Sequence, residues 1–181
     1  MKPGLLLCLL FALAADAFAH RLDEYLQATR ISVATNRIDL SIDLTPGVAV
    51  ASQLLAVIDK DRDGQISDEE WAAYSQLVLK NIRVELDEKT LTLGLVDTSF
   101  PALIEVKGGT GIIHIKATAV VGQLATGAHA LRLTNSHLPA ISVYLVNALV
   151  PKAPTIKITR QTRDELQKDY CMEFRVNSTP P

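Results

Sequence analysis

The sequence predicts a mainly β domain of the α+β class, a β-sandwich-like fold into which one helix-loop-helix is inserted. Two observations support this fold class. Short apolar segments that alternate with polar residues recur along most of the chain, which is typical of strands buried on one face. Residues 46–81 instead repeat their apolar side chains every three or four positions on both sides of an acidic loop, which is typical of two helices.

The first 19 residues have the pattern of a signal peptide. Lys2 precedes an apolar run from Leu5 to Ala15, and Ala17-Phe18-Ala19 is a small-residue cleavage signal. We therefore expect cleavage after Ala19 and a single β-rich domain over residues 20–181, secreted or periplasmic. The apolar run is too short for a membrane span, and we expect no span in the mature chain.

The first two strands are predicted to form a hairpin. Tyr25–Val33 is the first strand, and Ile38–Leu44 is the second, with apolar residues that alternate strictly with polar ones. Thr35-Asn36 connects the two strands and supplies the turn.

The two helices follow this hairpin. We expect Thr45 to cap the first helix, with Pro46 at its first position and an apolar stripe that ends at Ile58. Ser67 and Glu70 have the spacing of a capping box at the start of the second helix, which we expect to end at about residue 81. The helix pair is therefore an insertion between the second and third strands.

The loop between the helices, residues 59–70, offers an oxygen at each position that a calcium ion requires. Calcium binds six to eight oxygens at about 2.3–2.6 Å, and this spacing supplies them from one short segment. Gly64 stands where the chain must turn sharply. The predicted metal ligands are Asp59, Asp61, Asp63, the backbone carbonyl of Gln65, Ser67 through its hydroxyl or a held water, and Glu70 through both carboxylate oxygens.

In the spacing of this loop and its flanking helices, residues 46–81 resemble the EF-hand family of calcium-binding proteins. The resemblance implies bound Ca²⁺. It also implies a neighbour for Ile66, because EF-hand loops usually pair at this position; a second copy in a homodimer or a strand of the sandwich would serve. A single loop, whose charge is diluted by Lys60 and Arg62, predicts weak binding, at about 10⁻⁴–10⁻³ M.

The rest of the chain is predicted as β structure. Val84 and Leu86 alternate into a turn at residues 87–89, and Leu91 to Leu95 alternate out of it. Residues 108–111 are expected to form a hairpin turn rather than a phosphate-binding loop. Further strands are predicted at Leu103–Val106, Ile112–Val121, Ala128–Leu133, Ile141–Val150, Ile156–Thr162 and Tyr170–Val176.

Composition and motifs argue against several classes of function. The chain has 18 basic and 20 acidic residues, a net charge of −2, so we predict no basic face and no nucleic-acid partner. It contains no Gly-x-Ser-x-Gly elbow, phosphate-loop lysine motif or His-Glu-x-x-His helix, so we predict no catalytic residues and no enzyme activity. Calcium is expected to act as a structural or regulatory staple. The alternative is a calcium-dependent module that binds a protein partner.

A different metal function depends on His20, the predicted first residue of the mature chain. Its α-amino group and imidazole could chelate copper or nickel if His114, His129 or His137 folded nearby. Their wide spacing favours instead a solvent-facing strand position for His114 and loop positions for the other two. Residues 20–27 and the apolar strand after them also resemble the exported N-terminal part of bacterial nickel/cobalt permease-like proteins, which implies a periplasmic partner.

Overall fold

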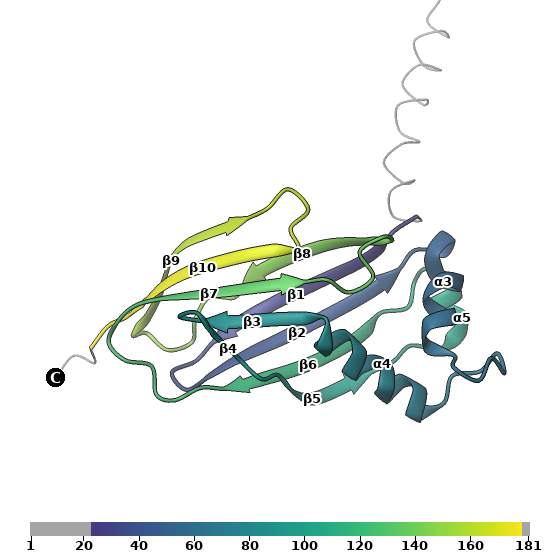
Figure 1. Ribbon diagram of the computed structural model, residues 1–181, viewed down its shortest axis with the longest axis horizontal. Helices are drawn as coiled ribbons and strands as arrows, with labels where there is room; N and C mark the ends of the chain where they lie inside the picture. The colour runs from purple at the N-terminus through teal and green to yellow at the C-terminus, as the bar shows by residue number, and fades with distance from the viewer. Residues whose placement is uncertain (1–22, 179–181) are drawn as a thin grey trace, which may run out of the picture.

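The computed structural model describes residues 23–178, which form two five-stranded sheets and three helices (Figure 1). The helices are α3 (Val48–Ile58), α4 (Asp68–Lys80) and α5 (Leu103–Lys107). The strands are β1 (Tyr25–Val33), β2 (Arg37–Pro46), β3 (Ile82–Leu86), β4 (Lys89–Thr90), β5 (Gly94–Ser99), β6 (Ile113–Val120), β7 (Gly127–Asn135), β8 (Ser142–Ala148), β9 (Ile156–Arg163) and β10 (Asp169–Val176). The predicted mainly β, sandwich-like fold is confirmed.

The strand order is β5-β6-β2-β1-β8 in the first sheet and β4-β3-β7-β10-β9 in the second. Neighbouring strands run antiparallel, except that β1 and β8 are parallel, with Tyr25 beside Ser142. The chain therefore crosses between the sheets several times. β1 lies next to its hairpin partner β2 on one side and next to a strand from late in the chain on the other.

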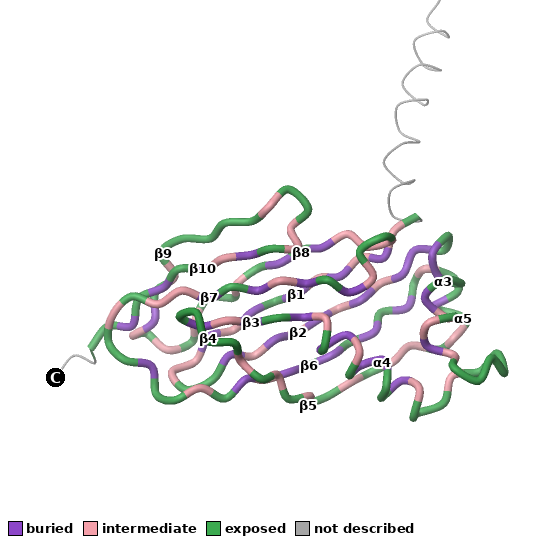
Figure 2. Tube along the Cα trace, in the orientation of Figure 1, coloured by how far each residue is buried: buried purple, intermediate pink, exposed green. Residues whose placement is uncertain are grey.

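The core consists of the side chains that point inward from alternate strand positions. Buried and less buried residues alternate along β1, β2 and β6 (Figure 2). Ile31, Ile42, Ile115, Leu133 and Met172 are completely buried. Burying a side chain of this size stabilises the fold by about 1.5–3 kcal/mol, so the alternation detected in the sequence accounts for much of the sandwich.

The helix pair α3–α4 connects β2 of the first sheet to β3 of the second, and all three helices gather at one end of the molecule (Figure 1). The predicted cap of the first helix was wrong: Gly47 is its N-cap, and Thr45 and Pro46 still belong to β2. β2 continues through Pro46 because this residue pairs with Tyr25 of β1, and the helix begins only after it. No helix in the described part of the chain is long and apolar enough to cross a membrane.

The predicted strand Leu103–Val106 is the short helix α5. The carboxylate of Glu105 accepts a hydrogen bond from the Ala102 N–H at 2.9 Å, which closes the first turn. The strands on either side of this segment, β5 and β6, pair directly with each other, so the segment is the connection between them and joins neither sheet. Residues 108–111 accordingly form the end of α5 and the link to β6 instead of a hairpin turn.

The alternating leucines 91, 93 and 95 do not form the single returning strand that was predicted. The hairpin pairs only Glu85 with Thr90 and Leu86 with Lys89, and the chain then crosses to β5 at the edge of the first sheet. All three leucines are half-buried and pack against the core, Leu91 and Leu93 in the crossing segment and Leu95 in β5. Their alternation therefore predicts correctly which side chains are buried, but it does not predict the strand with which the segment pairs.

Candidate metal centre

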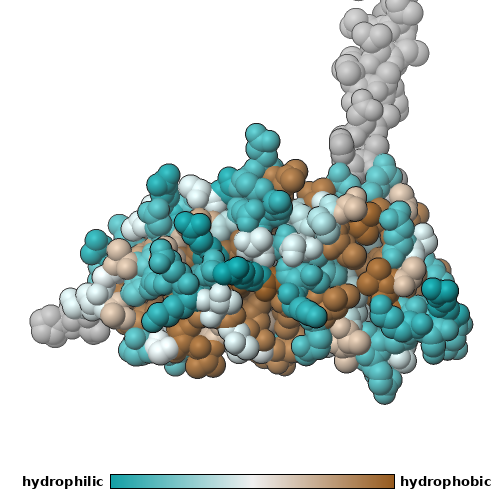
Figure 3. Space-filling view, in the orientation of Figure 1, coloured by the Kyte–Doolittle hydropathy of each residue, from teal (hydrophilic) through white to brown (hydrophobic). Residues whose placement is uncertain are grey.

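Both ends of the acidic loop are fixed by the helices. Asp59 caps the end of α3, where its N–H donates to the Leu55 carbonyl at 2.8 Å. Ser67 caps the start of α4: its hydroxyl accepts from the Glu70 N–H, and the Glu70 carboxylate accepts from the Ser67 N–H. The predicted capping box is therefore present. The loop lies at the lower right of the molecule, where hydrophilic side chains gather on the surface (Figure 3).

Three carboxylates of this loop converge. Asp59, Asp61 and Asp63 each offer an oxygen, and these atoms lie within 4.8 Å of one another. Oxygens that share a calcium ion at about 2.3–2.6 Å lie at most about 5 Å apart, so the spacing suits one cation of this size. Asp59 is half-buried, and the other two residues are exposed. In residues 23–178 this is the only group of three or more metal-ligating side chains.

Backbone N–H groups orient the three carboxylates. Gly64 donates to Asp59 Oδ2 at 3.1 Å, Asp63 to Asp61 Oδ1 at 3.1 Å, and Gln65 to Asp63 Oδ1 at 2.7 Å. Each carboxylate keeps free lone pairs after these contacts. Asp59 Oδ1 is buried and has no hydrogen-bond partner among the described residues. An unsatisfied buried carboxylate oxygen is costly, and a cation would satisfy it, so the residues present fit a hard metal ion.

Glu70 is not part of this three-residue group. Its Oε1 accepts from the Lys60 N–H at 2.6 Å, and its Oε2 accepts from the Ser67 N–H at 2.9 Å and the Ser67 hydroxyl at 3.1 Å. The hydrogen bonds from the Ser67 and Lys60 backbone lower the pKa of Glu70. The carboxylate is thus kept ionised and spans the two ends of the loop.

The backbone of the loop takes the sharp turn expected at Gly64, where φ is +83°. No atom lies within 4 Å of the position of an added Cβ, so glycine is needed here for its backbone conformation and not for space. Two residues earlier Arg62 also has a positive φ, 62°. Ile66 is half-buried against the core, and it belongs to none of the strand pairings between described residues.

Comparison with known proteins assigns no family to the chain, because no family model and no curated protein matches it.

The histidines considered as partners of His20 lie on different elements, and His20 itself is outside the described residues. His114 is exposed on β6, as predicted, with Nδ1 at 2.7 Å from Asp43 Oδ1. His129 belongs to β7, not to a loop. His137 does lie in the loop after β7, but it is 1 % exposed. The expected loop position was therefore wrong for His129 and correct for His137, although His137 is buried by contacts with residues distant in sequence.

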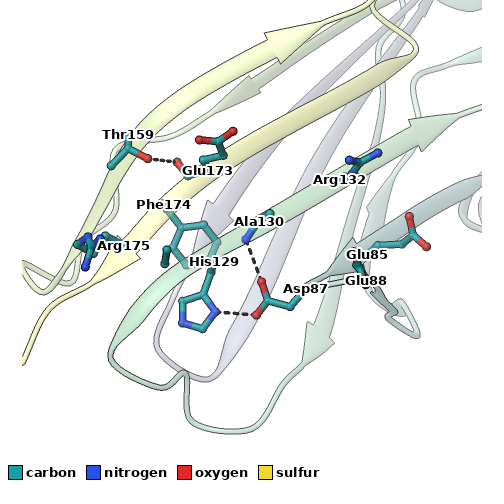
Figure 4. A pocket seen from close by; sticks show the side chains of 11 residues that line it. Glu85, Asp87, Glu88, His129, Ala130, Arg132, Thr159, Glu173, Phe174 and Arg175 are labelled. Carbon is teal, nitrogen blue, oxygen red and sulfur yellow. Dashed lines mark hydrogen bonds and ion pairs between the residues drawn. The ribbon is translucent and has the colours of Figure 1, made fainter.

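His129 forms part of a hollow of about 720 Å³ lined by residues of β3, β7, β9 and β10 in the second sheet (Figure 4). Its Nδ1 lies 2.7 Å from Asp87 Oδ2 and its Nε2 lies 2.8 Å from the Ala125 carbonyl, while the ring stacks on Phe174. Burial lowers the pKa of His129, but the hydrogen bonds to Ala125 and Asp87 outweigh burial and raise it. Both ring nitrogens are engaged, so this side chain ties the β3–β4 turn to the loop before β7 and is not free to bind a ligand.

Proposed function

We propose that this chain is a calcium-binding protein whose helix-loop-helix is an EF-hand, and that the ion has a structural or regulatory role in the sandwich. The observation that carries the proposal is the convergence of Asp59, Asp61 and Asp63 with a buried, unpaired oxygen on Asp59. The ligand set would be these three carboxylates, the Gln65 carbonyl, Ser67 and Glu70. For Glu70 to bind, its oxygens must exchange their hydrogen bonds to the loop ends for the ion.

The chemistry of the donors favours calcium over other metals. Every candidate ligand is an oxygen, and no histidine or cysteine belongs to the acidic group formed by the described residues. Hard oxygen donors suit calcium or magnesium, whereas copper, nickel and zinc favour nitrogen or sulfur. A flexible loop with several carboxylates tolerates the high coordination number of calcium better than the strict octahedron of magnesium.

The position of the loop supports a role as a staple. The helix pair is the connection between β2 of the first sheet and β3 of the second, so fixing the loop fixes how the chain passes between the two sheets. In the ion-free protein three carboxylates crowd one small volume and repel one another, and a cation would replace this repulsion with bonds. Binding to the folded state alone stabilises it by about 2.7 kcal/mol at a hundredfold excess of calcium over the dissociation constant.

The signal-peptide pattern supports export, to the periplasm or the exterior, where calcium is more abundant than inside cells. A dissociation constant near 10⁻⁴–10⁻³ M would suit that environment. The backbone of Ile66 belongs to no strand pairing between the described residues, so a homodimer through the loop is the protein partner that we propose first.

Calorimetric calcium titration of the purified protein, with Asp59→Ala beside it, tests the proposal. We expect one calcium per chain, no binding heat in the variant, and a calcium-dependent change in the fluorescence of Trp71, the only tryptophan. Asp68→Asn is the matched control: it removes one exposed acidic charge from the loop itself, at a position outside the ligand set. Absence of heat in the unmodified protein at millimolar calcium would refute the proposal.

A further inference from the structure

A buried hydrogen-bonded chain connects helix α4 to the body of the sandwich. The Tyr74 hydroxyl from α4 lies 2.6 Å from the Tyr25 hydroxyl at the start of β1 and 2.9 Å from His137 Nε2. These three residues are 2 %, 0 % and 1 % exposed. Buried polar groups are costly to leave unpaired, so each of them resists the movement of the other two.

His137 extends this chain into both sheets through its backbone. Its carbonyl accepts from Gln27 Nε2 at 2.8 Å and from the Tyr144 hydroxyl at 3.0 Å. Its N–H donates to Asn135 Oδ1 at 2.9 Å, and Asn135 Nδ2 donates to Gln27 Oε1 at the same distance. The network therefore joins β1 and β8 of the first sheet to the end of β7 in the second.

The far end of α4 is fastened to the same segment. Asn81, the C-cap of α4, accepts from the Ser136 N–H at 2.9 Å through its carbonyl, and its side-chain Nδ2 lies 3.4 Å from His137 Nδ1. The segment after His137 contacts the start of β1, where the Tyr25 N–H donates to the Ile141 carbonyl at 2.7 Å. Residues 136–141 are thus held between the end of α4 and the start of β1.

Glu70 and Tyr74 are four residues apart on α4, so they lie on the same side of the helix, one turn from each other. If Glu70 binds calcium, the first turn of α4 becomes ordered or rotates. Because Tyr74 is one turn away, its hydroxyl then shifts relative to Tyr25 and His137. We propose that the Tyr25–Tyr74–His137 chain transmits calcium occupancy of the loop to the start of β1 and to residues 136–141. This inference rests on the proposed calcium site, and it adds the segments of the sandwich that respond when calcium is bound.

Hydrogen–deuterium exchange of the purified protein, with and without calcium, tests the coupling. We expect calcium at a hundredfold excess over its dissociation constant to slow exchange up to about a hundredfold in residues 24–28 and 136–141 as well as in the loop. The edge strand β9 is the internal reference, because no residue of this network belongs to it. Its amide exchange occurs by local opening, and calcium should leave the rate unchanged. In Tyr74→Phe the slowing should remain in the loop and be lost in residues 136–141.

Tyr170→Phe is the matched control, because it removes another hydroxyl from a buried tyrosine, one that donates to Gln161 in the second sheet. This variant should keep the pattern of the unmodified protein. Tyr25→Phe is a second test if Tyr74→Phe does not fold. Slowing confined to the loop in the unmodified protein, or an unchanged pattern in both network variants, would overturn the coupling while the calcium site stands. Absence of calcium binding in the titration would instead refute the proposed calcium site.

Discussion

The ring of Trp71 stacks on the ring of Phe100, with centroids 4.5 Å apart and planes inclined by 12°. Trp71 stands directly after Glu70 in the first turn of α4, and Phe100 follows β5 in the first sheet. The stack therefore joins the end of the acidic loop to the sandwich. It also places the single tryptophan where a change in the loop alters its surroundings.

Replacing Phe100 by leucine should loosen this contact. The substitution keeps an apolar side chain but removes the aromatic pair, which is worth about 0.5–1.5 kcal/mol beyond burial. We expect a loss of about 1 kcal/mol in urea unfolding and a red-shifted Trp71 emission, because water gains access to the ring. Unfolding at the same urea midpoint as the unmodified protein would show that the stack contributes nothing.

Glu70→Gln and Glu69→Gln form a matched pair of neighbouring charge deletions. Glu70 reaches back to both ends of the loop, whereas Glu69 is exposed and has no ligand position. If Glu70 is the bidentate ligand that we propose, Glu70→Gln should weaken calcium binding by at least about tenfold, and Glu69→Gln should change it little. Equal effects in calorimetric titration would indicate a general charge effect and contradict the role given to Glu70.

Gly64→Ala should strain the loop through the backbone alone. At φ +83° a side chain costs about 1–2 kcal/mol, although no atom lies within 4 Å of the added Cβ. We expect a lower calcium affinity with little change in the core. Gly122→Ala serves as control, since it also meets no atom within 4 Å but does not have the left-handed backbone of Gly64. The prediction fails if both variants titrate alike.

Acidification should destabilise the protein through His137. Burial lowers the pKa of His137 to about 4 from an ordinary value of 6.5. As the pH falls below about 6.5, His137 becomes protonated in the unfolded chain, but in the folded chain it stays neutral until about pH 4. The free energy of unfolding therefore decreases between these two pH values. The full effect is about 3 kcal/mol. Urea unfolding between pH 7 and pH 4.5 should show this slope, and His137→Gln should flatten it.

His129 provides an internal comparison for this experiment, because its pKa is raised in the folded state. Its contribution to stability is present at low pH and is lost as the pH rises through the folded pKa. His129→Gln should therefore make the decline on acidification steeper, the opposite of the change expected for His137→Gln. A common direction for both variants would contradict the assignment of the two environments.

Patterns local in sequence predicted the fold well. The strict alternation of residues 38–44 predicts which face of β2 is buried. The spacing of residues 59–70 predicts that Asp59, Asp61 and Asp63 converge, although Glu70 lies outside this group. Leu103–Val106 was misassigned because four mostly apolar residues suit a short helix as well as a strand. His137 could not be placed from the sequence, since its burial depends on Tyr74 and Gln27, both remote along the chain. No signal near His137 distinguishes it from an exposed loop residue.

The parallel pairing of β1 with β8 has a consequence for the order in which the protein folds. The pairing brings the Gln27 side chain to Ser142, 115 residues away in the chain. Contacts between such distant segments form slowly, because closing a long loop of chain is entropically unfavourable and little is gained until it is closed. The first sheet therefore keeps one side of β1 unpaired until β8 has been synthesised.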